Sequence, residues 1–242
     1  MDSEREQASL ITIVPTHTSE LDEVSWLRLK ITYSNSPNIT FVLPEGCSTK
    51  EFSKVFPLAD FRFFPTSRFE SYESYNRWLL TPELYESFSN FTFTLICQSD
   101  AILIRPLSEL VNPYDYVGAP WIPGWLMGWH PIRRTLTHKK GLAKRRLEVG
   151  NGGISVRRNS AFINFTSKVP RLGEWTGEDM VISYFGSRYG LKIAPKTFAE
   201  NVFLETGRRE VRELSEIPGL YGFHNLQMFN PLLEEHILRR NS

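Results

Sequence analysis

The sequence lacks the features that define several specialised classes of protein. Only two cysteines, Cys47 and Cys97, occur among its 242 residues, which excludes a disulfide scaffold and a thiolate metal site and suits a reducing compartment, with Cys97 in the core. No apolar run approaches the ~20 residues that span a bilayer, and the charged residues 1–7 lack the apolar centre of a secretion signal. We therefore expect a cytoplasmic protein without a membrane span.

The chain also lacks an excess of charge of either sign. Its 28 Lys and Arg nearly balance its 27 Asp and Glu, and the formal net charge of +1 argues against a nucleic-acid partner. Hydrophobic residues make up 41% of the chain, which is enough for a substantial core, and no stretch rich in Pro, Gly and Ser divides it. We expect a single domain over residues 1–242, with residues 1–9 disordered.

What the sequence does contain is a series of short apolar runs separated by helical patterns. Strands are predicted over Leu10–Val14, Ile39–Leu43 and Phe61–Phe64, with a helix between the first two. This order predicts an α/β fold, a Rossmann-like domain with a mostly parallel central sheet flanked by helices. Residues 121–129 are rich in Trp, Pro and Gly and fit no regular element, and the basic residues 138–146 are expected to form a mobile loop.

One carboxylate interrupts the most apolar part of the chain. Residues 92–97 predict a buried strand, which ends at Gln98-Ser99-Asp100 before the apolar run resumes. A buried carboxylate needs a partner, and a carboxylate at the carboxyl end of a central strand lies where ligands of α/β proteins bind. A hard cation that clamps a diphosphate would satisfy Asp100. The alternative is a solvated aspartate in a turn between two strands.

Three later segments also place polar residues at the end of a strand or the start of a helix. They are Asn151-Gly152-Gly153, Glu178-Asp179 and His224. Each has an ordinary explanation, since Asn-Gly is a hairpin signal, acidic residues suit the first turn of a helix, and a lone histidine is usually structural. Because such positions converge at one edge of an α/β sheet, their combination favours a shared site.

The order of these motifs resembles that of nucleotide-sugar glycosyltransferases with the GT-A fold. The resemblance extends from about Leu10 to His224 and rests on Gln98-Ser99-Asp100 and on residues 115–121, 150–155, 177–179 and 222–225. More narrowly, the chain is similar to an uncharacterised family of GT-A-like domains found beside polysaccharide-synthesis proteins. The resemblance therefore implies a role in polysaccharide biosynthesis.

The resemblance implies a donor site at the ends of the first and central strands. In GT-A enzymes an Asp-X-Asp motif binds a divalent cation and the diphosphate of the nucleotide sugar, whereas the first acid is replaced here by Gln98. A Mn²⁺ or Mg²⁺ ion held by Asp100 and His224 is implied, and the missing acid leaves metal dependence open. The implied donor-binding residues are Thr16, Gln98, Ser99, Asp100, Asn151, Gly152 and Gly153.

Other residues are candidates for the acceptor side of the reaction. The resemblance implies that Asp179 is the general base that deprotonates the acceptor hydroxyl, with Glu178 in reserve. Trp121 and Trp125 are candidate acceptor-binding residues because aromatic faces suit the apolar faces of sugars, and core packing is the alternative. The basic residues 139–146 either close over the diphosphate or form a solvated loop.

The expected activity is transfer of a sugar from a nucleotide-sugar donor to a glycan or glycolipid acceptor, with inversion by direct displacement. A second hypothesis, motivated by the incomplete acidic triplet, is a non-catalytic binder of carbohydrate or nucleotide that kept the fold. A nucleotidyltransferase is less favoured, because the chain has no Gly-rich phosphate loop followed by Lys near its N-terminus.

Overall fold

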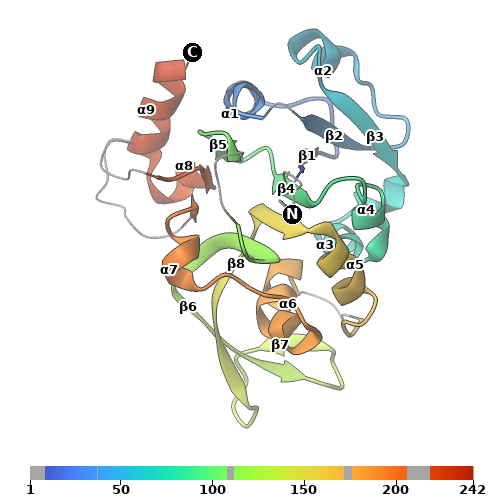
Figure 1. Ribbon diagram of the computed structural model, residues 1–242, viewed down its shortest axis with the longest axis vertical. Coiled ribbons are helices and arrows are strands. Elements are labelled where there is room, and N and C mark those ends of the chain that lie inside the picture. The colour runs from blue at the N-terminus through green and yellow to red at the C-terminus, as the bar shows by residue number, and fades with distance from the viewer. Residues whose placement is uncertain (1–8, 37, 108–111, 172–175, 206–218, 242) are drawn as a thin grey trace, which may run out of the picture.

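The computed structural model describes residues 9–36, 38–107, 112–171, 176–205 and 219–241 (Figure 1). Apart from short 3₁₀ turns, its elements are β1 (Leu10–Pro15), α1 (Glu23–Ser34), β2 (Ile39–Pro44), α2 (Lys50–Val55), β3 (Asp60–Phe64), α3 (Tyr72–Leu79), α4 (Pro82–Glu86), β4 (Phe93–Cys97), β5 (Ala101–Leu103), β6 (Tyr116–His130), β7 (Thr135–Thr137), β8 (Lys144–Arg158), α5 (Asn159–Thr166), α6 (Glu178–Phe185), α7 (Lys196–Ala199), β9 (Phe203–Leu204), β10 (Gly222–His224), α8 (Leu226–Phe229) and α9 (Pro231–Asn241). None of the helices in the described ranges combines the length and the apolar character that a membrane span requires. The disorder expected for residues 1–9 falls outside the described residues except at Ser9.

A seven-stranded sheet forms the centre of the molecule, in the order β3-β2-β1-β4-β8-β6-β7. The first four strands run parallel to one another, and β8, β6 and β7 are added in antiparallel pairs. The predicted α/β class is confirmed, although the sheet is mixed rather than mostly parallel. The reason is that the second half of the chain returns as long antiparallel strands instead of further β-α-β units.

The parallel strands β1, β2 and β4 are buried on both faces, which explains why they consist of nearly unbroken apolar runs, whereas the edge strand β3 is largely exposed. Successive residues of β1 illustrate the arrangement. Ile13 packs toward α3, α4, α5 and α6 on one face, whereas Val14 packs toward α1 and α2 on the other.

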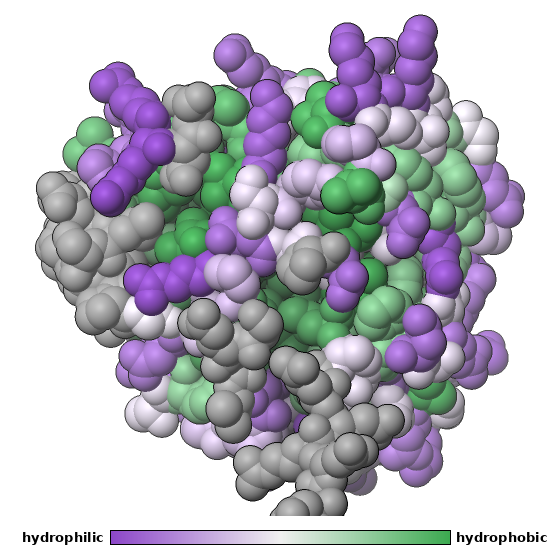
Figure 2. Space-filling model, turned by 45° about the horizontal axis from the view of Figure 1, so that its top comes forward, coloured by the Kyte–Doolittle hydropathy of each residue, from purple (hydrophilic) through white to green (hydrophobic). Residues whose placement is uncertain are grey.

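On the face seen in Figure 2, hydrophilic residues surround a hollow in which hydrophobic surface is visible.

The two longest strands, β6 and β8, occupy segments for which the sequence predictions were wrong. Residues 121–129 lie within β6 instead of an irregular segment, and residues 144–146 begin β8 instead of belonging to a loop. The Pro and Gly residues of this segment are accommodated because the pairing of β6 with β8 shifts in register between Gly118 and Trp125. Gly124 lies in this stretch with a φ of 92°, a backbone conformation that glycine adopts without steric cost.

The Asn-Gly-Gly segment at residues 151–153 forms neither a turn nor a hairpin. It continues β8 between Val149 and Ile154, and Cys97 of β4 pairs with Ile154. This strand therefore passes directly beside the end of β4, where the Gln98-Ser99-Asp100 turn begins.

A smaller sheet, in the order β5-β10-β9, brings the end of the chain to the same place. His224 of β10 pairs with Ala101 of β5, the residue that follows Asp100. The adjoining helix α9 is tied to α1 by a buried ion pair in which Arg28 Nε lies 2.9 Å from Glu234 Oε1. The topology thus places His224 and Asp100 together, although they lie far apart in the sequence.

Candidate active site

A pocket of about 470 Å³ opens at the carboxyl ends of β1 and β4. It is bounded by three segments: residues 15–17 after β1, residues 98–100 after β4, and residues 69–75 at the start of α3. Its volume suits a small organic ligand, and ligands of open α/β sheets bind at the carboxyl ends of the strands. Predicted donor-site residues Thr16, Gln98, Ser99 and Asp100 all line this pocket.

At the β4 side of the pocket, His224 lies between two carboxylates. Its Nε2 is 3.3 Å from Oδ1 of Asp100, and its Nδ1 is 3.2 Å from Oε1 of Glu205. Nε2 is buried and has no well-directed hydrogen bond to any described residue. The Asp100 side chain is about half exposed, at 47%, whereas His224 and Glu205 are each only 11% exposed. Asp100 therefore forms the part of this group that a ligand in the pocket can reach.

Both titratable groups in the His224–Asp100 contact are shifted. Burial alone lowers the pKa of the His224 imidazole, but its interactions with Asp100 and Glu205 outweigh burial and raise that pKa to about 9. Desolvation alone raises the pKa of the Asp100 carboxyl, yet the contact with His224 brings it below its ordinary value. In the absence of a bound cation, His224 is therefore an imidazolium held between two carboxylates.

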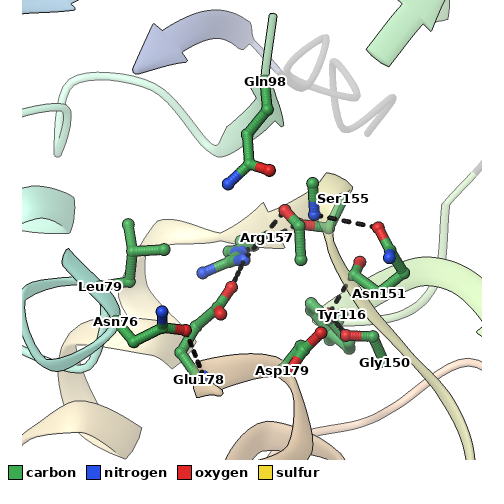
Figure 3. Close-up of polar contacts among 12 residues, drawn as sticks. Asn76, Leu79, Gln98, Tyr116, Gly150, Asn151, Ser155, Arg157, Glu178 and Asp179 are labelled. Atoms are coloured by element: carbon green, nitrogen blue, oxygen red, sulfur yellow. Dashed lines mark hydrogen bonds and ion pairs between the residues drawn. The ribbon is translucent and has the colours of Figure 1, made fainter. Parts of the chain in front are cut away.

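A second polar cluster lies behind the pocket and is built around Arg157 (Figure 3). The guanidinium is fully buried, and its Nη2 lies 2.8 Å from Oε1 of Glu178. Arg157 also donates to Ser155 Oγ at 3.0 Å and to the Tyr85 hydroxyl at 2.8 Å. Because Glu178 neutralises a buried cation, its carboxylate is already committed, which weakens its candidacy as a reserve base.

The same cluster fixes the start of α6. The backbone N–H of Glu178 donates to Oδ1 of Asn76 at 2.8 Å, so a side chain of α3 satisfies one of the free N–H groups of the first turn. Together with the Arg157 ion pair, this contact holds the first turn of α6 against α3 and β8. Asp179, the next residue, is therefore carried on a well-anchored turn.

Asp179 has the strongly shifted pKa expected of an acid–base group. Desolvation and the negative charge of Glu178 raise its pKa to about 8. A Cβ added to Gly177 would lie 2.7 Å from Oδ1 of Asp179 and 3.0 Å from the Tyr72 hydroxyl, so these two side chains face the same turn. Since Tyr72 also lines the pocket, Asp179 lies next to one of the pocket walls.

The structure gives a different reason for Gly152 and Gly153 than close approach of a donor. A Cβ on Gly152 would lie 2.0 Å from Glu178 Oε1, and one on Gly153 would lie 2.1 Å from His224 Nε2. The space beside each glycine is thus filled by a side chain of this protein. Asn151 is likewise buried, and its Oδ1 accepts from the backbone N–H of Gly153 at 3.0 Å. These three predicted donor-site residues lie under the site and support it.

Gln98 and Thr16 are held by contacts within the protein. Gln98 donates through Nε2 to the Tyr75 hydroxyl at 3.2 Å, and its backbone N–H donates to the Gly153 carbonyl at 2.8 Å. The Thr16 hydroxyl donates to the Thr18 carbonyl at 3.0 Å and shapes the loop after β1. Both residues border the pocket through preorganised side chains.

The two predicted acceptor-binding tryptophans have different environments. Trp121 is only 7% exposed and packs against Gly150 and the buried Met127 and Leu147, which favours the alternative of core packing over contact with a sugar. Trp125 is 45% exposed, with its ring centroid 6.0 Å from that of His138.

Sequence reasoning missed Arg157, Glu205, Tyr72 and Tyr75. A signal for Arg157 was present, because a charged residue that follows the apolar Ile154 and Val156 in one strand requires a buried partner. Glu205 follows the two-residue strand β9 and carries no comparable signal. Its role depends on the topology that brings it to His224.

Solved structures of glycosyltransferases share the fold of this chain. The apo structure of the bifunctional glycosyltransferase WbbM matches over 96% of this chain and 48% of its own, with 9% identity and a TM-score of 0.53. The apo form of the glycosyltransferase GlyE of Streptococcus pneumoniae TIGR4 matches over 96% of this chain and 60% of its own, with 12% identity and a TM-score of 0.55. Mouse xyloside xylosyltransferase 1 matches over 89% of this chain and 97% of its own, with 9% identity and a TM-score of 0.53.

At these identities the likeness establishes the fold alone. The chain spans about half the length of WbbM and 60% of GlyE. No curated protein matches it in sequence. A family described as "Protein of unknown function (DUF5672)" matches residues 59–224.

The ion pair between Arg157 and Glu178 leads to a prediction about stability. Glu178→Gln leaves a buried guanidinium without a counter-charge and is expected to lower the free energy of unfolding by about 3 kcal/mol or more, as measured by urea denaturation at pH 7. The matched control is Glu83→Gln, whose partner Arg68 lies 2.9 Å away in a pair that is 37% and 38% exposed; it should cost less than about 1 kcal/mol. Equal losses in the two variants would contradict the role given to the buried pair.

Proposed function

The chain belongs to the DUF5672 family, and from its fold and its pocket we propose that it is a glycosyltransferase that moves a sugar from a nucleotide-sugar donor to a glycan or glycolipid acceptor. The observation that carries the proposal is the pocket at the ends of β1 and β4, which has Asp100 at its rim and an acid of raised pKa, Asp179, beside its wall. Strong pKa shifts in a cleft are typical of catalytic groups.

The residues present suit a divalent cation held by Asp100 and His224. His224 Nε2 is a buried atom without a directed hydrogen bond, and its 3.3 Å distance from Asp100 Oδ1 is close to the roughly 3 Å between adjacent ligands of an octahedral Mg²⁺ or Mn²⁺. The Glu205 carboxylate lies 3.2 Å from His224 Nδ1 and can accept its hydrogen bond. A carboxylate commonly holds a metal-binding histidine in this way. When bound, such a cation would neutralise the diphosphate leaving group.

The charge of the pocket supports the same proposal. Its described lining contains the carboxylates of Glu70 and Asp100 and no Lys or Arg. A diphosphate would therefore meet no fixed positive side chain there. In the described part of the chain, no three His, Cys, Asp or Glu side chains gather as a metal site, so oxygens of the donor and water would complete the ligand set around Asp100 and His224.

Asp179 is the proposed general base. An acceptor hydroxyl oxygen forms a bond to the anomeric carbon while the bond from that carbon to the diphosphate breaks, and the hydroxyl proton passes to Asp179. Attack from the side opposite the leaving group inverts the configuration. A carboxylate with a pKa near 8 is a stronger base than an ordinary aspartate, which suits this role at a pH near its own pKa.

The donor site can be tested without an acceptor by thermal denaturation with a panel of nucleoside diphosphates, with and without Mn²⁺. At about 100 times the Kd, a ligand of the folded state stabilises by about 2.7 kcal/mol, which raises the Tm by roughly 5–10 °C. We expect one nucleoside diphosphate to give this shift only with Mn²⁺. Asp100→Ala should abolish the shift, and Asp60→Ala, which changes an exposed carboxylate on β3, should retain it.

A shift that survives Asp100→Ala would contradict the assigned cation site. Incubation of the identified nucleotide sugar with Mn²⁺ then separates an enzyme from a binder. Release of free nucleoside diphosphate is expected from a transferase, whereas a non-catalytic binder releases none.

The raised pKa of Asp179 leads to a prediction that joins activity and stability. Asp179→Asn is expected to lower kcat by about 10²- to 10⁴-fold, and the wild-type kcat/KM should rise as pH increases up to about 8, because only the ionised base accepts the proton. The unfolded carboxyl ionises near pH 3.8, so the folded protein binds the extra proton between these pH values and loses stability as pH rises through that window.

Asp179→Asn removes that loss. We compare the unfolding free energy of Asp179→Asn with that of the wild type at each pH by urea denaturation. The advantage of the variant should be larger at pH 9 than at pH 5, by about 1 kcal/mol or more. An intact variant with unchanged turnover would contradict the assignment of the base. A gain that does not depend on pH would contradict the raised pKa.

A further inference from the structure

The outer parts of β6 and β8, together with the edge strand β7 that pairs with β6, carry charge of one sign. We name residues 121–147 the basic ribbon. It contains seven Lys and Arg and no Asp or Glu, so the rest of the chain has a formal net charge of −6 although the whole chain is at +1. The seven are Arg133, Arg134, Lys139, Lys140, Lys144, Arg145 and Arg146. This separation of charge is hidden in the overall composition.

All seven cationic side chains are exposed, and none forms an ion pair with a described residue. Arg145 and Arg146 donate to the carbonyls of Tyr184 and Pro123, which orders the side chains and leaves their charges uncompensated. Unpaired cations gathered on one projecting element produce a positive potential that favours an anionic partner.

Apolar side chains are exposed among these cations. Ile132 is 88% exposed in the turn between β6 and β7, and Trp125 and Leu126 on β6 are 45% and 44% exposed. Leu126 pairs across the strands with Arg146, so an apolar and a cationic side chain lie side by side on one face of the ribbon. Exposed Trp and aliphatic groups beside Lys and Arg are typical of surfaces that enter the interface of a bilayer.

The basic ribbon projects from the edge of the sheet where the pocket opens. Because β8 runs antiparallel to β4 and Ile154 pairs with Cys97, the residues of β8 that precede Gly153 extend past the carboxyl end of β4. In Figure 1 the ribbon forms the end of the molecule opposite α1 and α2. A flat surface in contact with the ribbon would therefore lie on the side of the candidate active site.

We propose that the basic ribbon docks the protein onto an anionic lipid surface, and, given the function proposed above, that the acceptor is a glycolipid presented at that surface. The phosphates of acidic lipids match the seven cations, and the headgroup region accommodates Ile132, Trp125 and Leu126. A nucleic acid would match the cations alone and would leave the exposed aliphatic groups without an apolar partner.

Flotation with vesicles tests the docking surface without any turnover. The wild-type protein is expected to float with vesicles of equal parts phosphatidylcholine and phosphatidylglycerol, to remain unbound with phosphatidylcholine alone, and to dissociate at high salt. The ribbon variant combines R133Q, R134N, K139Q and K140Q, where Asn suits the left-handed backbone of Arg134 (φ 52°). It should bind roughly tenfold or more weakly.

Two further variants make the test specific. I132S removes the most exposed apolar side chain without changing charge and is expected to weaken vesicle binding several-fold. The matched control combines K30Q, K50Q, K54Q and K168Q, which removes four exposed lysines outside the ribbon and should leave binding unchanged. Unchanged far-ultraviolet circular dichroism and Tm show that each variant is folded.

Equal binding by the ribbon and control variants would overturn the proposal. Tight binding to duplex DNA that depends on the ribbon cations and is indifferent to I132S would also overturn it and identify a nucleic-acid surface instead. Because flotation needs no catalysis, an inactive protein that floats retains the docking surface. If the protein hydrolyses its donor in solution but does not float with the vesicles, the proposed function stands and the docking proposal is wrong.

Discussion

The buried ion pair between Arg157 and Glu178 is the constraint on which the arrangement of the candidate site depends. A guanidinium with no exposed surface requires a counter-charge, and only the first turn of α6 supplies one among the described residues that contact it. The pair therefore fixes α6 to β8, while Asn76 fixes the same turn to α3. Asp179 owes its position to this arrangement. Its pKa is raised first by burial and then by the negative charge of Glu178, the carboxylate that neutralises Arg157.

Strand β8 connects the two polar clusters through its pair of glycines. Adjacent residues of a strand point to opposite faces, so Gly152 makes room for Glu178 on one side and Gly153 makes room for His224 on the other. A side chain at either position would displace the group that lies against it. The strand thus positions the proposed base and the proposed cation ligand relative to each other through local backbone geometry.

Periodicity and order along the chain were sufficient for the parallel half of the fold. Residues 10–14, 39–43 and 92–97 form strands as predicted, because strands buried on both faces must be apolar throughout. The prediction was wrong for residues 121–129, where Pro and Gly suggested an irregular segment and the structure accommodates them by shifts in the pairing of β6 with β8. Local composition does not report such pairing, since it depends on a partner strand far along the chain.

For the site, the order of motifs indicated that Asp100 and His224 belong together, and the structure places them 3.3 Å apart. For Trp121 the sequence left sugar contact and core packing open, because an aromatic residue in an apparent loop can do either. The structure buries it, which favours core packing. Glu205 could not be selected, because its contact with His224 arises only from the pairing of β9, β10 and β5.

The walls of the pocket come from two parts of the chain, one inside and one outside the region matched by the family. The region shared with the family, residues 59–224, contains Asp100, Asp179 and His224, whereas the β1 side of the pocket, residues 15–17, lies before it. The groups proposed to act on the bond therefore lie inside the region that the family shares, and one wall of the pocket lies outside it. A change in the loop after β1 would therefore reshape one wall of the pocket and leave Asp100, Asp179 and His224 in place.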